Sequence, residues 1–230
     1  MRSFLDELPA GRLLLEVSLW SADLAALGAE AARISPLADL LHIDASDAIF
    51  TPELLFFPDL VRAIRPYADR PLHVHLMAHR PARLATAFAD AGADLITLHA
   101  EADGADDGIA AIHAAGLPAG LALTLGTEPA CIGDLLNAVD AVVLIGTPLG
   151  TKGTAMDPAA PARIAATRQL LDILGRQIPI FADGGIRRDT VAPLAAAGAT
   201  GVVAGSLLWD SPDRAATAAW IRSHRAGGNR

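Results

Sequence analysis

The sequence predicts a single-domain α/β protein, a (β/α)8 TIM barrel, on three observations. Eight short apolar segments, rich in β-branched residues, alternate with segments of helical periodicity along the 230 residues, as parallel strands buried on both faces do. No linker of disordered composition interrupts the alternation, and the length suits one barrel. A sequence echo between residues 91–96 and 197–202 indicates repeated units. Eight strand–helix units in one domain favour a closed barrel over a doubly wound open sheet.

The elements follow a lead-in at residues 1–12, which contains one helical turn at Phe4-Leu5. Strands are predicted at 13–18, 40–44, 72–77, 95–99, 119–124, 141–145, 178–182 and 201–204. Helices are predicted at 21–34, 58–65, 81–91, 107–115, 128–136, 162–174, 188–197 and 211–222. Ser21 is the expected N-cap of the first helix, whose apolar face would comprise Leu24, Leu27, Ala31 and Ile34. The barrel would then span 13–225, within one domain at 1–230.

Composition narrows the classes of partner and compartment. The net charge of −8 argues against nucleic acid or an anionic membrane surface, although a local patch of donors could still bind an anionic metabolite. No apolar run reaches membrane-spanning length, and the N-terminus has no signal-peptide pattern. The single cysteine, Cys131, excludes an internal disulfide, and its helix-like surroundings predict that it packs in the interior. An intracellular, cytoplasmic location fits these features.

Polar side chains interrupt three of the predicted strands near their carboxyl ends. His42 and Asp44 lie two residues apart and therefore on one face of the second strand. On this pair alone, a core histidine bonded to a turn carboxylate is the simpler interpretation. His75 on the third strand and Asp183 at the end of the seventh favour a metal site, because the carboxyl ends of barrel strands share one rim. Two histidines and two carboxylates suit Zn²⁺, Fe²⁺, Mn²⁺ or Co²⁺.

Glycine pairs mark a second feature of this rim. Gly184-Gly185 follows the seventh strand, and Gly205-Ser206 follows the eighth. The loops after these two strands are the usual phosphate site of the barrel, because bare backbone N–H groups can approach the oxyanions there. Either pair alone is a turn signal of low specificity, whereas both together predict a phosphate-binding site.

Six stretches together resemble the ribulose-phosphate 3-epimerase family over nearly the whole chain, and their conjunction is far more specific than any one of them. The stretches are Ser18-Leu19-Trp20-Ser21-Ala22-Asp23, His42-Ile43-Asp44, Val74-His75-Leu76-Met77, Ala91-Gly92-Ala93-Asp94 leading to His99-Ala100-Glu101, Asp183-Gly184-Gly185-Ile186, and Ala204-Gly205-Ser206. The resemblance implies metal ligands at His42, Asp44, His75 and Asp183, a substrate-contacting serine at Ser18, and phosphate-binding residues at Gly184, Gly185, Gly205 and Ser206.

The activity that the resemblance implies is inversion of C3 of D-ribulose 5-phosphate to give D-xylulose 5-phosphate. One divalent metal would stabilise an enediolate, while Asp44 and Asp183 remove and return the proton on opposite faces. The family also implies a homo-oligomer. The long apolar loop at 45–57 would then serve as a subunit contact or a lid.

The chain departs from the family pattern around the substrate. The family has Met-Asp-Gly after the second strand, where this chain has Ser46-Asp47-Ala48. Its Asn-Pro-Gly-Phe-Gly-Gly-like loop after the sixth strand is replaced here by residues 146–153, which contain Gly150, Lys152 and Gly153. The substrate-binding residues expected in full are Ser18, His75, Met77, Gly150, Lys152, Gly153, Gly184, Gly185, Gly205 and Ser206.

These departures leave two further interpretations open. One is an enzyme of the same barrel that epimerises or decarboxylates another phosphorylated ketose or sugar acid. Decarboxylation is disfavoured because the sequence lacks the Asp-x-Lys-x-x-Asp run of related barrel decarboxylases. The other is a barrel that binds without catalysis, which is disfavoured because all four ligand positions are filled.

Four side chains carry three further structural predictions. Strand periodicity points Glu16 and His73 into the barrel one layer below the rim, where we expect them to contact each other, since an unpaired buried carboxylate is costly. His99 is expected to be an outer-shell or core histidine. Lys152 is expected to reach the anionic end of the ligand when its loop closes.

Overall fold

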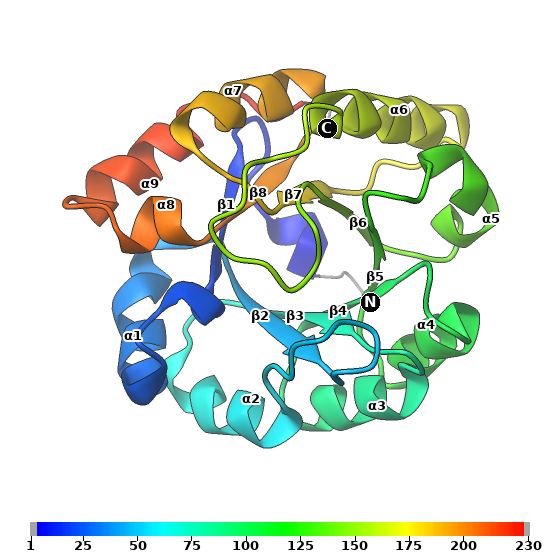
Figure 1. Ribbon diagram of the computed structural model, residues 1–230, viewed down its shortest axis with the longest axis horizontal. Helices are drawn as coiled ribbons and strands as arrows, with labels where there is room; N and C mark the ends of the chain where they lie inside the picture. The colour runs from blue at the N-terminus through cyan, green and yellow to red at the C-terminus, as the bar shows by residue number, and fades with distance from the viewer. Residues whose placement is uncertain (1–3, 228–230) are drawn as a thin grey trace.

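The computed structural model describes residues 4–227 and contains a closed barrel (Figure 1). All eight strands are parallel and pair in chain order, and the last pairs with the first. The strands are β1 (Leu14–Ser18), β2 (Leu40–Ser46), β3 (Leu72–Met77), β4 (Leu95–His99), β5 (Ala119–Leu123), β6 (Ala141–Ile145), β7 (Ile180–Asp183) and β8 (Gly201–Ala204). The (β/α)8 prediction is confirmed, and the predicted strand bounds agree with these within two residues.

The helices form a ring outside the strands (Figure 1). They are α1 (Leu27–Ile34), α2 (Pro58–Ile64), α3 (Ala82–Asp90), α4 (Ala105–Ala114), α5 (Gly133–Leu136), α6 (Ala160–Ile173), α7 (Arg188–Ala197), α8 (Ser206–Trp209) and α9 (Arg214–Arg222). Short 3-10 turns are η1 (Phe4–Glu7), η2 (Leu19–Ser21), η3 (Leu24–Ala26), η4 (Ser35–Leu37), η5 (Arg65–Tyr67) and η6 (Pro129–Ile132). None of the described helices is both long and apolar enough to cross a membrane. The outermost residues of the predicted domain, 1–3 and 228–230, lie outside the described part of the chain.

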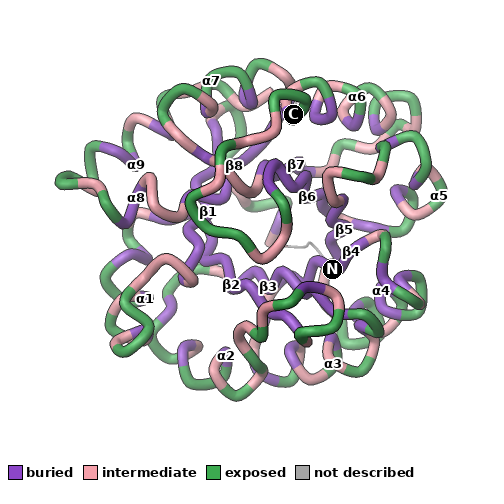
Figure 2. Tube along the Cα trace, in the orientation of Figure 1, coloured by how far each residue is buried: buried purple, intermediate pink, exposed green. Residues whose placement is uncertain are grey.

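The strands are buried along the barrel (Figure 2), and the alternation of their side chains divides the apolar residues into two clusters. One fills the layer between strands and helices. The other lies inside the barrel and includes Leu14, Leu40 and Phe181. Leu5 of η1 joins this inner cluster, so the predicted helical turn of the lead-in packs against the amino end of the barrel.

The amino end of the barrel carries a repeated hydrogen-bond pair. The residue before each even-numbered strand donates its backbone N–H to the carbonyl of a residue on the preceding strand and accepts that residue's N–H with its side chain. These pairs are Asp39 with Leu15, Asp94 with Leu72, Asp140 with Ala119 and Thr200 with Ile180, at N···O distances of 2.7–3.0 Å. The sequence echo between 91–96 and 197–202 contains two of them.

The first helix is shorter than predicted. Ser21 ends η2 and caps nothing with its side chain, whereas Asp23 accepts the N–H of Ala25 at 3.0 Å and caps η3. The N-cap prediction is therefore wrong. Leu27, Ala31 and Ile34 are buried as predicted, but Leu24 is 51% exposed because it precedes the α-helical register.

Two other local predictions also fail. The predicted helix at 211–222 forms as α9 but begins only at Arg214, where Asp213 caps it by accepting the N–H of Ala216 at 2.9 Å. Cys131 is exposed rather than packed inside. It lies in the 3-10 turn η6, where Pro129 and Ile132 share the buried side and leave Cys131 on the opposite side.

Candidate active site

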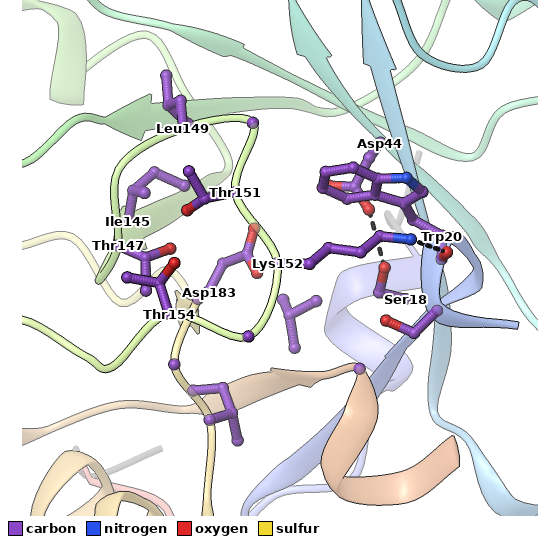
Figure 3. Close-up of a pocket in the computed structure, with 18 of the residues that line it drawn as sticks. Ser18, Trp20, Asp44, Ile145, Thr147, Leu149, Thr151, Lys152, Thr154 and Asp183 are labelled. Carbon is purple, nitrogen blue, oxygen red and sulfur yellow. Dashed lines mark hydrogen bonds between the residues drawn. The ribbon is translucent and has the colours of Figure 1, made fainter. Parts of the chain in front are cut away.

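The carboxyl ends of the strands surround one pocket (Figure 3). Ser18 ends β1, Asp183 ends β7, and the loop after β6 extends Lys152 across the opening. The predicted site residues that line the pocket are Ser18, Asp44, His75, Met77, Gly150, Lys152, Gly153, Asp183, Gly184, Gly185, Gly205 and Ser206. His42 is fully buried behind them and meets the pocket through Asp44 and Asp183. The structure therefore brings all the predicted site residues together.

Four of these side chains form a compact His/Asp cluster. His42 Nε2 lies 3.2 Å from Asp44 Oδ1 and 3.6 Å from Asp183 Oδ2. His75 Nδ1 lies 3.6 Å from Asp44 Oδ1 and 3.5 Å from Asp183 Oδ2. One ligand atom from each residue falls within 4.8 Å of all the others. One small ion could therefore contact all four side chains.

His42 is oriented from below by a buried carboxylate. Its Nδ1 lies 2.9 Å from Glu16 Oε1, and the same oxygen lies 2.6 Å from His73 Nδ1. This confirms the predicted Glu16–His73 contact. His73 Nε2 in turn bonds Thr97 Oγ1 at 2.7 Å. Burial raises the pKa of Glu16, but the facing histidines outweigh it and lower that pKa to about 2, so Glu16 is a carboxylate that accepts both N–H groups.

His75 is oriented by a second chain of side chains. Its Nε2 lies 2.8 Å from His99 Nε2, and His99 Nδ1 lies 3.3 Å from Glu101 Oε2. Glu101 Oε1 accepts both the backbone N–H and the hydroxyl of Thr124, at 2.9 and 2.8 Å. Burial lowers the pKa of His99 to about 4, so its ring is neutral. His99 thus lies in the outer shell of the cluster, as predicted.

The pKa values of the two cluster carboxylates, Asp44 and Asp183, are shifted in opposite directions. Burial raises the pKa of Asp44, yet His42 and His75 reverse this and hold that pKa well below its usual range. Asp44 Oδ2 also accepts the hydroxyl of Ser18 at 2.8 Å. Burial likewise raises the pKa of Asp183, and the negative charge of Asp44 adds to the rise. One site thus contains two carboxylates with opposite pKa shifts, the usual arrangement of an acid–base pair.

The donor set fits a divalent metal. His42 Nε2 and His75 Nδ1 are buried without a hydrogen-bond partner, and both face Asp44 and Asp183. In each ring the other nitrogen is engaged by a chain that ends in a carboxylate, which is how proteins commonly orient metal-binding imidazoles. Two imidazole nitrogens without hydrogen-bond partners beside two carboxylates suit Zn²⁺, Fe²⁺, Mn²⁺ or Co²⁺.

The glycine pair after β7 is required by its positive φ and by close packing, and the glycine after β8 also lies against a neighbouring loop. Gly184 and Gly185 have φ of +88° and +70°, and a Cβ on Gly184 would lie 2.4 Å from Thr147 Oγ1. A Cβ on Gly205 would lie 2.7 Å from Ser21 Oγ. The bare backbone therefore allows the loops after β1, β6, β7 and β8 to converge at one side of the pocket.

Arg187 is a pocket residue that the sequence did not single out. It follows the glycine pair, and its guanidinium bonds Gly153 O at 2.9 Å and Ser206 Oγ at 3.4 Å. Arg188 is adjacent but turns away, bonding Thr217 and lying over the Trp220 ring. Two successive arginines at a helix start carry no sequence signal that would distinguish one from the other.

Comparisons with known proteins agree with this geometry. A model of the ribulose-phosphate 3 epimerase family matches residues 14–209. The chain is 35% identical over 213 residues to the ribulose-phosphate 3-epimerase of Mycobacterium tuberculosis (strain ATCC 25618 / H37Rv), a match that covers 92% of this chain and 93% of the relative. It is 35% identical over 211 residues to that of Bacillus subtilis (strain 168), covering 90% and 97%.

Among solved structures, KGPDC from Streptococcus mutans superposes with a TM-score of 0.69 at 15% identity, covering 93% of this chain and 97% of that one. At this identity the likeness shows the fold alone.

The fold and the rim site together define a (β/α)8 barrel with a candidate metal centre at the carboxyl ends of its strands. Because the family match spans most of the chain and the relatives cover nearly all of it, the chain belongs to the ribulose-phosphate 3 epimerase family. The relatives are isomerases by name, and the resemblance predicted from six stretches of sequence is confirmed.

Proposed function

We propose that this protein is a metal-dependent epimerase that interconverts D-ribulose 5-phosphate and D-xylulose 5-phosphate by inverting C3. The observation that carries the proposal is the His/Asp cluster, in which Asp44 and Asp183 approach the same point from β2 and β7. Both carboxylates also line the pocket, so each can reach a bound substrate. A family relationship alone would leave the chemistry open, whereas this pair supports a two-base inversion.

The proton at C3 is the atom that moves. One of the two carboxylates removes it, and the other delivers a proton to the opposite face of the resulting enediolate, which inverts the carbon. His42, Asp44, His75 and Asp183 would hold the metal, which when bound supplies Lewis-acid stabilisation of charge on the substrate oxygens. Ser18 orients Asp44 through their 2.8 Å hydrogen bond, and Met77 supplies apolar lining.

The phosphate would lie on the side of the pocket formed by the loops after β7 and β8. Gly184, Gly185 and Gly205 expose backbone there, and Ser206 adds a hydroxyl. The loop after β6 contributes Gly150 and Gly153 to the same lining.

A second candidate is epimerisation of another phosphorylated ketose or a sugar acid. Lys152 and the altered loop around it favour this alternative, because they change the surface that meets the substrate while the His/Asp cluster is complete. A barrel that binds without catalysis is the third candidate.

Metal analysis of the purified protein, followed by a coupled assay with D-ribulose 5-phosphate, separates the candidates. Bound metal with turnover supports the first. Bound metal without turnover of this sugar moves the assignment to the second, and a protein that takes up no added metal and turns nothing over leaves the third.

We further propose a homo-oligomer, since the 45–57 loop exposes Leu54 at 77% and Phe57 at 58% on the outer surface beside α2. Light scattering tests it, and a monomer across the micromolar range would contradict it. A cytoplasmic location fits a phosphorylated substrate, which is charged and does not cross membranes unaided.

A further inference from the structure

The loop after β6 is held across the pocket by hydrogen bonds from two cations, Lys152 and Arg187. Lys152 Nζ donates to Trp20 O at 2.6 Å (Figure 3) and lies 4.3 Å from the centre of the Trp20 ring. Arg187 donates to Gly153 O at 2.9 Å. The two bonds attach neighbouring residues of the loop to two different elements, the turn η2 that follows β1 and the start of α7.

The Lys152–Trp20 and Arg187–Gly153 bonds are part of a closed ring of contacts. Arg187 also donates to Ser206 Oγ at 3.4 Å, and the neighbouring Gly205 packs against Ser21 Oγ. The ring runs in order through Lys152, Trp20, Ser21, Gly205, Ser206, Arg187 and Gly153, all of which line the pocket. Lys152 and Arg187 therefore both border the glycine side of the pocket, where the proposed phosphate would lie.

Lys152 is also the only lysine in the sequence. The 18 basic residues comprise 17 arginines and this one lysine, so arginine is used at every other cationic position. An ammonium is a compact point charge on a flexible stem, which can follow an oxyanion as a loop moves, whereas a guanidinium demands a fixed planar geometry. The single ammonium lies at the mouth of the candidate active site.

We infer that Lys152 and Arg187 form a two-cation clamp that closes on the phosphate dianion of a sugar phosphate, an inference that rests on the proposed function. Both cations now bond neutral carbonyls, Trp20 O and Gly153 O. Phosphate oxygens are stronger acceptors for cationic donors than carbonyls are. Substrate binding exchanges these two bonds for bonds to phosphate and leaves the loop seated over the sugar.

Charge balance narrows the substrate class. Among the side chains that line the pocket, the charge of a bound divalent metal would cancel the two cluster carboxylates, which leaves Lys152 and Arg187 as the basic side chains of the described lining, with a combined charge of +2. A phosphomonoester carries about −1.5 to −2 at neutral pH, which this pair neutralises. A phosphorylated sugar acid brings one further negative charge with no cation to meet it. The clamp thus selects a ketose phosphomonoester over an acid.

The single lysine permits a direct test by amine acylation. Metal-loaded protein is treated with an acylating reagent, and modification of Lys152 is measured by mass spectrometry, with the N-terminal amine of the same chain as internal control. Ribulose 5-phosphate and inorganic phosphate should each slow Lys152 acylation at least about 5-fold, whereas free ribulose should not. Arg187→Met should weaken protection by inorganic phosphate.

Kinetics of three variants supply the second readout. Lys152→Met and Arg187→Met should each raise KM for ribulose 5-phosphate about 10-fold to 100-fold, the range expected for a lost hydrogen bond to a charged group, with kcat changed little. Lys152→Arg should recover only part of the loss. Arg188→Met is the matched control, since Arg188 contacts Thr217 and Trp220 away from the pocket, and its KM should equal that of the wild type.

The outcomes separate the clamp from the proposed function. If the wild type turns over ribulose 5-phosphate but KM is unchanged in Lys152→Met and Arg187→Met, the clamp is overturned and the epimerase proposal stands. The same holds if the wild type turns over this sugar and Lys152 is not protected from acylation. No turnover, but protection by inorganic phosphate that is lost in Arg187→Met, keeps the clamp and rejects ribulose 5-phosphate as substrate. Protection of Lys152 by a sugar acid that lacks phosphate, together with no protection by inorganic phosphate, also overturns the clamp.

Discussion

The two ends of this barrel differ in how fully their buried polar groups are hydrogen-bonded. At the amino end, Asp39, Asp94, Asp140 and Thr200 each bond the preceding strand through both backbone and side chain. At the carboxyl end, His42 and His75 each keep one buried ring nitrogen without a hydrogen-bond partner. An unmade hydrogen bond in the interior costs free energy, and the barrel carries this cost at the two ring nitrogens that face Asp44 and Asp183.

Asp39 shows how fully the amino end satisfies its charges. Its carboxylate, with a side chain 6% exposed, accepts bonds from Arg12 at 2.7 and 2.8 Å and from Arg222 at 3.2 and 3.3 Å, besides the Leu15 N–H. Asp44, further along the chain on β2, faces two histidines across distances of 3.2 and 3.6 Å instead. The comparison teaches that β2 begins beside a fully paired carboxylate and carries, towards its end, a carboxylate that faces the unpartnered nitrogens of the His/Asp cluster.

The largest expected effect comes from removing a ligand at the carboxyl end. His75→Ala should lower both metal content and turnover, because the cluster loses one of its two imidazole donors and leaves Asp44 and Asp183 facing each other. Metal analysis by mass spectrometry and the coupled epimerase assay measure the two effects. Wild-type metal occupancy in this variant would mean that the four residues do not share one ion. Its unfolding midpoint without metal should stay close to that of the wild type.

Asp183→Asn separates proton transfer from metal binding at the same end. The amide keeps one oxygen donor but removes the basic carboxylate, so metal should be partly retained while turnover falls by about 10²-fold or more, the typical size of an acid–base contribution. Parallel metal and kinetic measurements check this. Near-normal turnover would place the base elsewhere, with His99 the next candidate.

The amino end should respond in stability rather than activity. Asp39→Asn should lower the free energy of unfolding by about 2 kcal/mol, since two arginines and a backbone N–H lose their charged acceptor. The kcat of the folded variant should be unchanged. Asp59→Asn on α2, whose side chain is 86% exposed, is the matched control and should change stability by less than about 0.5 kcal/mol.

The stability difference between the wild type and Asp39→Asn should depend on pH, in a direction set by the pKa shift of Asp39. Burial raises the pKa of Asp39, but Arg12, the Leu15 N–H and Arg222 outweigh it and lower that pKa below its usual value. A lowered pKa contributes stability that is present above the unfolded-state pKa and is lost as the pH falls through the folded-state value. The stability gap between wild type and Asp39→Asn should therefore be full at neutral pH and shrink below about pH 4. Urea unfolding at about pH 7 and about pH 3 measures it, and a gap that widens in acid would contradict it.

The sequence predicted the barrel and its ligands because both depend on periodicity. Apolar strands with polar side chains at their carboxyl ends place His42, Asp44, His75 and Asp183 on one rim whatever the loops do. The Glu16–His73 contact followed from the same rule. The anchors at the amino end were visible only as the Asp94 and Thr200 echo.

What the sequence did not predict depends on single loop geometries. Arg187 and Arg188 are adjacent residues of the same type, yet Arg187 faces the pocket and Arg188 lies over the Trp220 ring. The Lys152–Trp20 contact joins residues 132 positions apart, which no local pattern reports. The exposure of Cys131 was decided by a 3-10 turn rather than the expected α-helix.

The smallest expected effect is on metal affinity and comes from Glu101, which lies behind His99 at the carboxyl end of the barrel. Glu101→Gln should lower metal affinity about 10-fold, the lower range for loss of an outer-shell partner. With Glu101 ionised, His99 donates from Nδ1 and accepts at Nε2, so His75 donates from Nε2 and keeps its Nδ1 lone pair for the metal.

A glutamine at position 101 cannot satisfy both of its neighbours. If its amide N–H₂ faces His99, the hydrogens along the chain reverse and His75 Nδ1 acquires one, which opposes metal binding. If its oxygen faces His99, the N–H₂ meets the Thr124 N–H instead. Metal competition against a chelating dye measures the affinity, and the ¹⁵N shifts of His75 report which ring nitrogen carries the hydrogen. Exposed Glu128→Gln, in the loop after β5, is the control. Unchanged affinity and unchanged His75 shifts in Glu101→Gln would mean that the His99–Glu101 chain only fills space, and that the carboxyl end orients its ligand through packing alone.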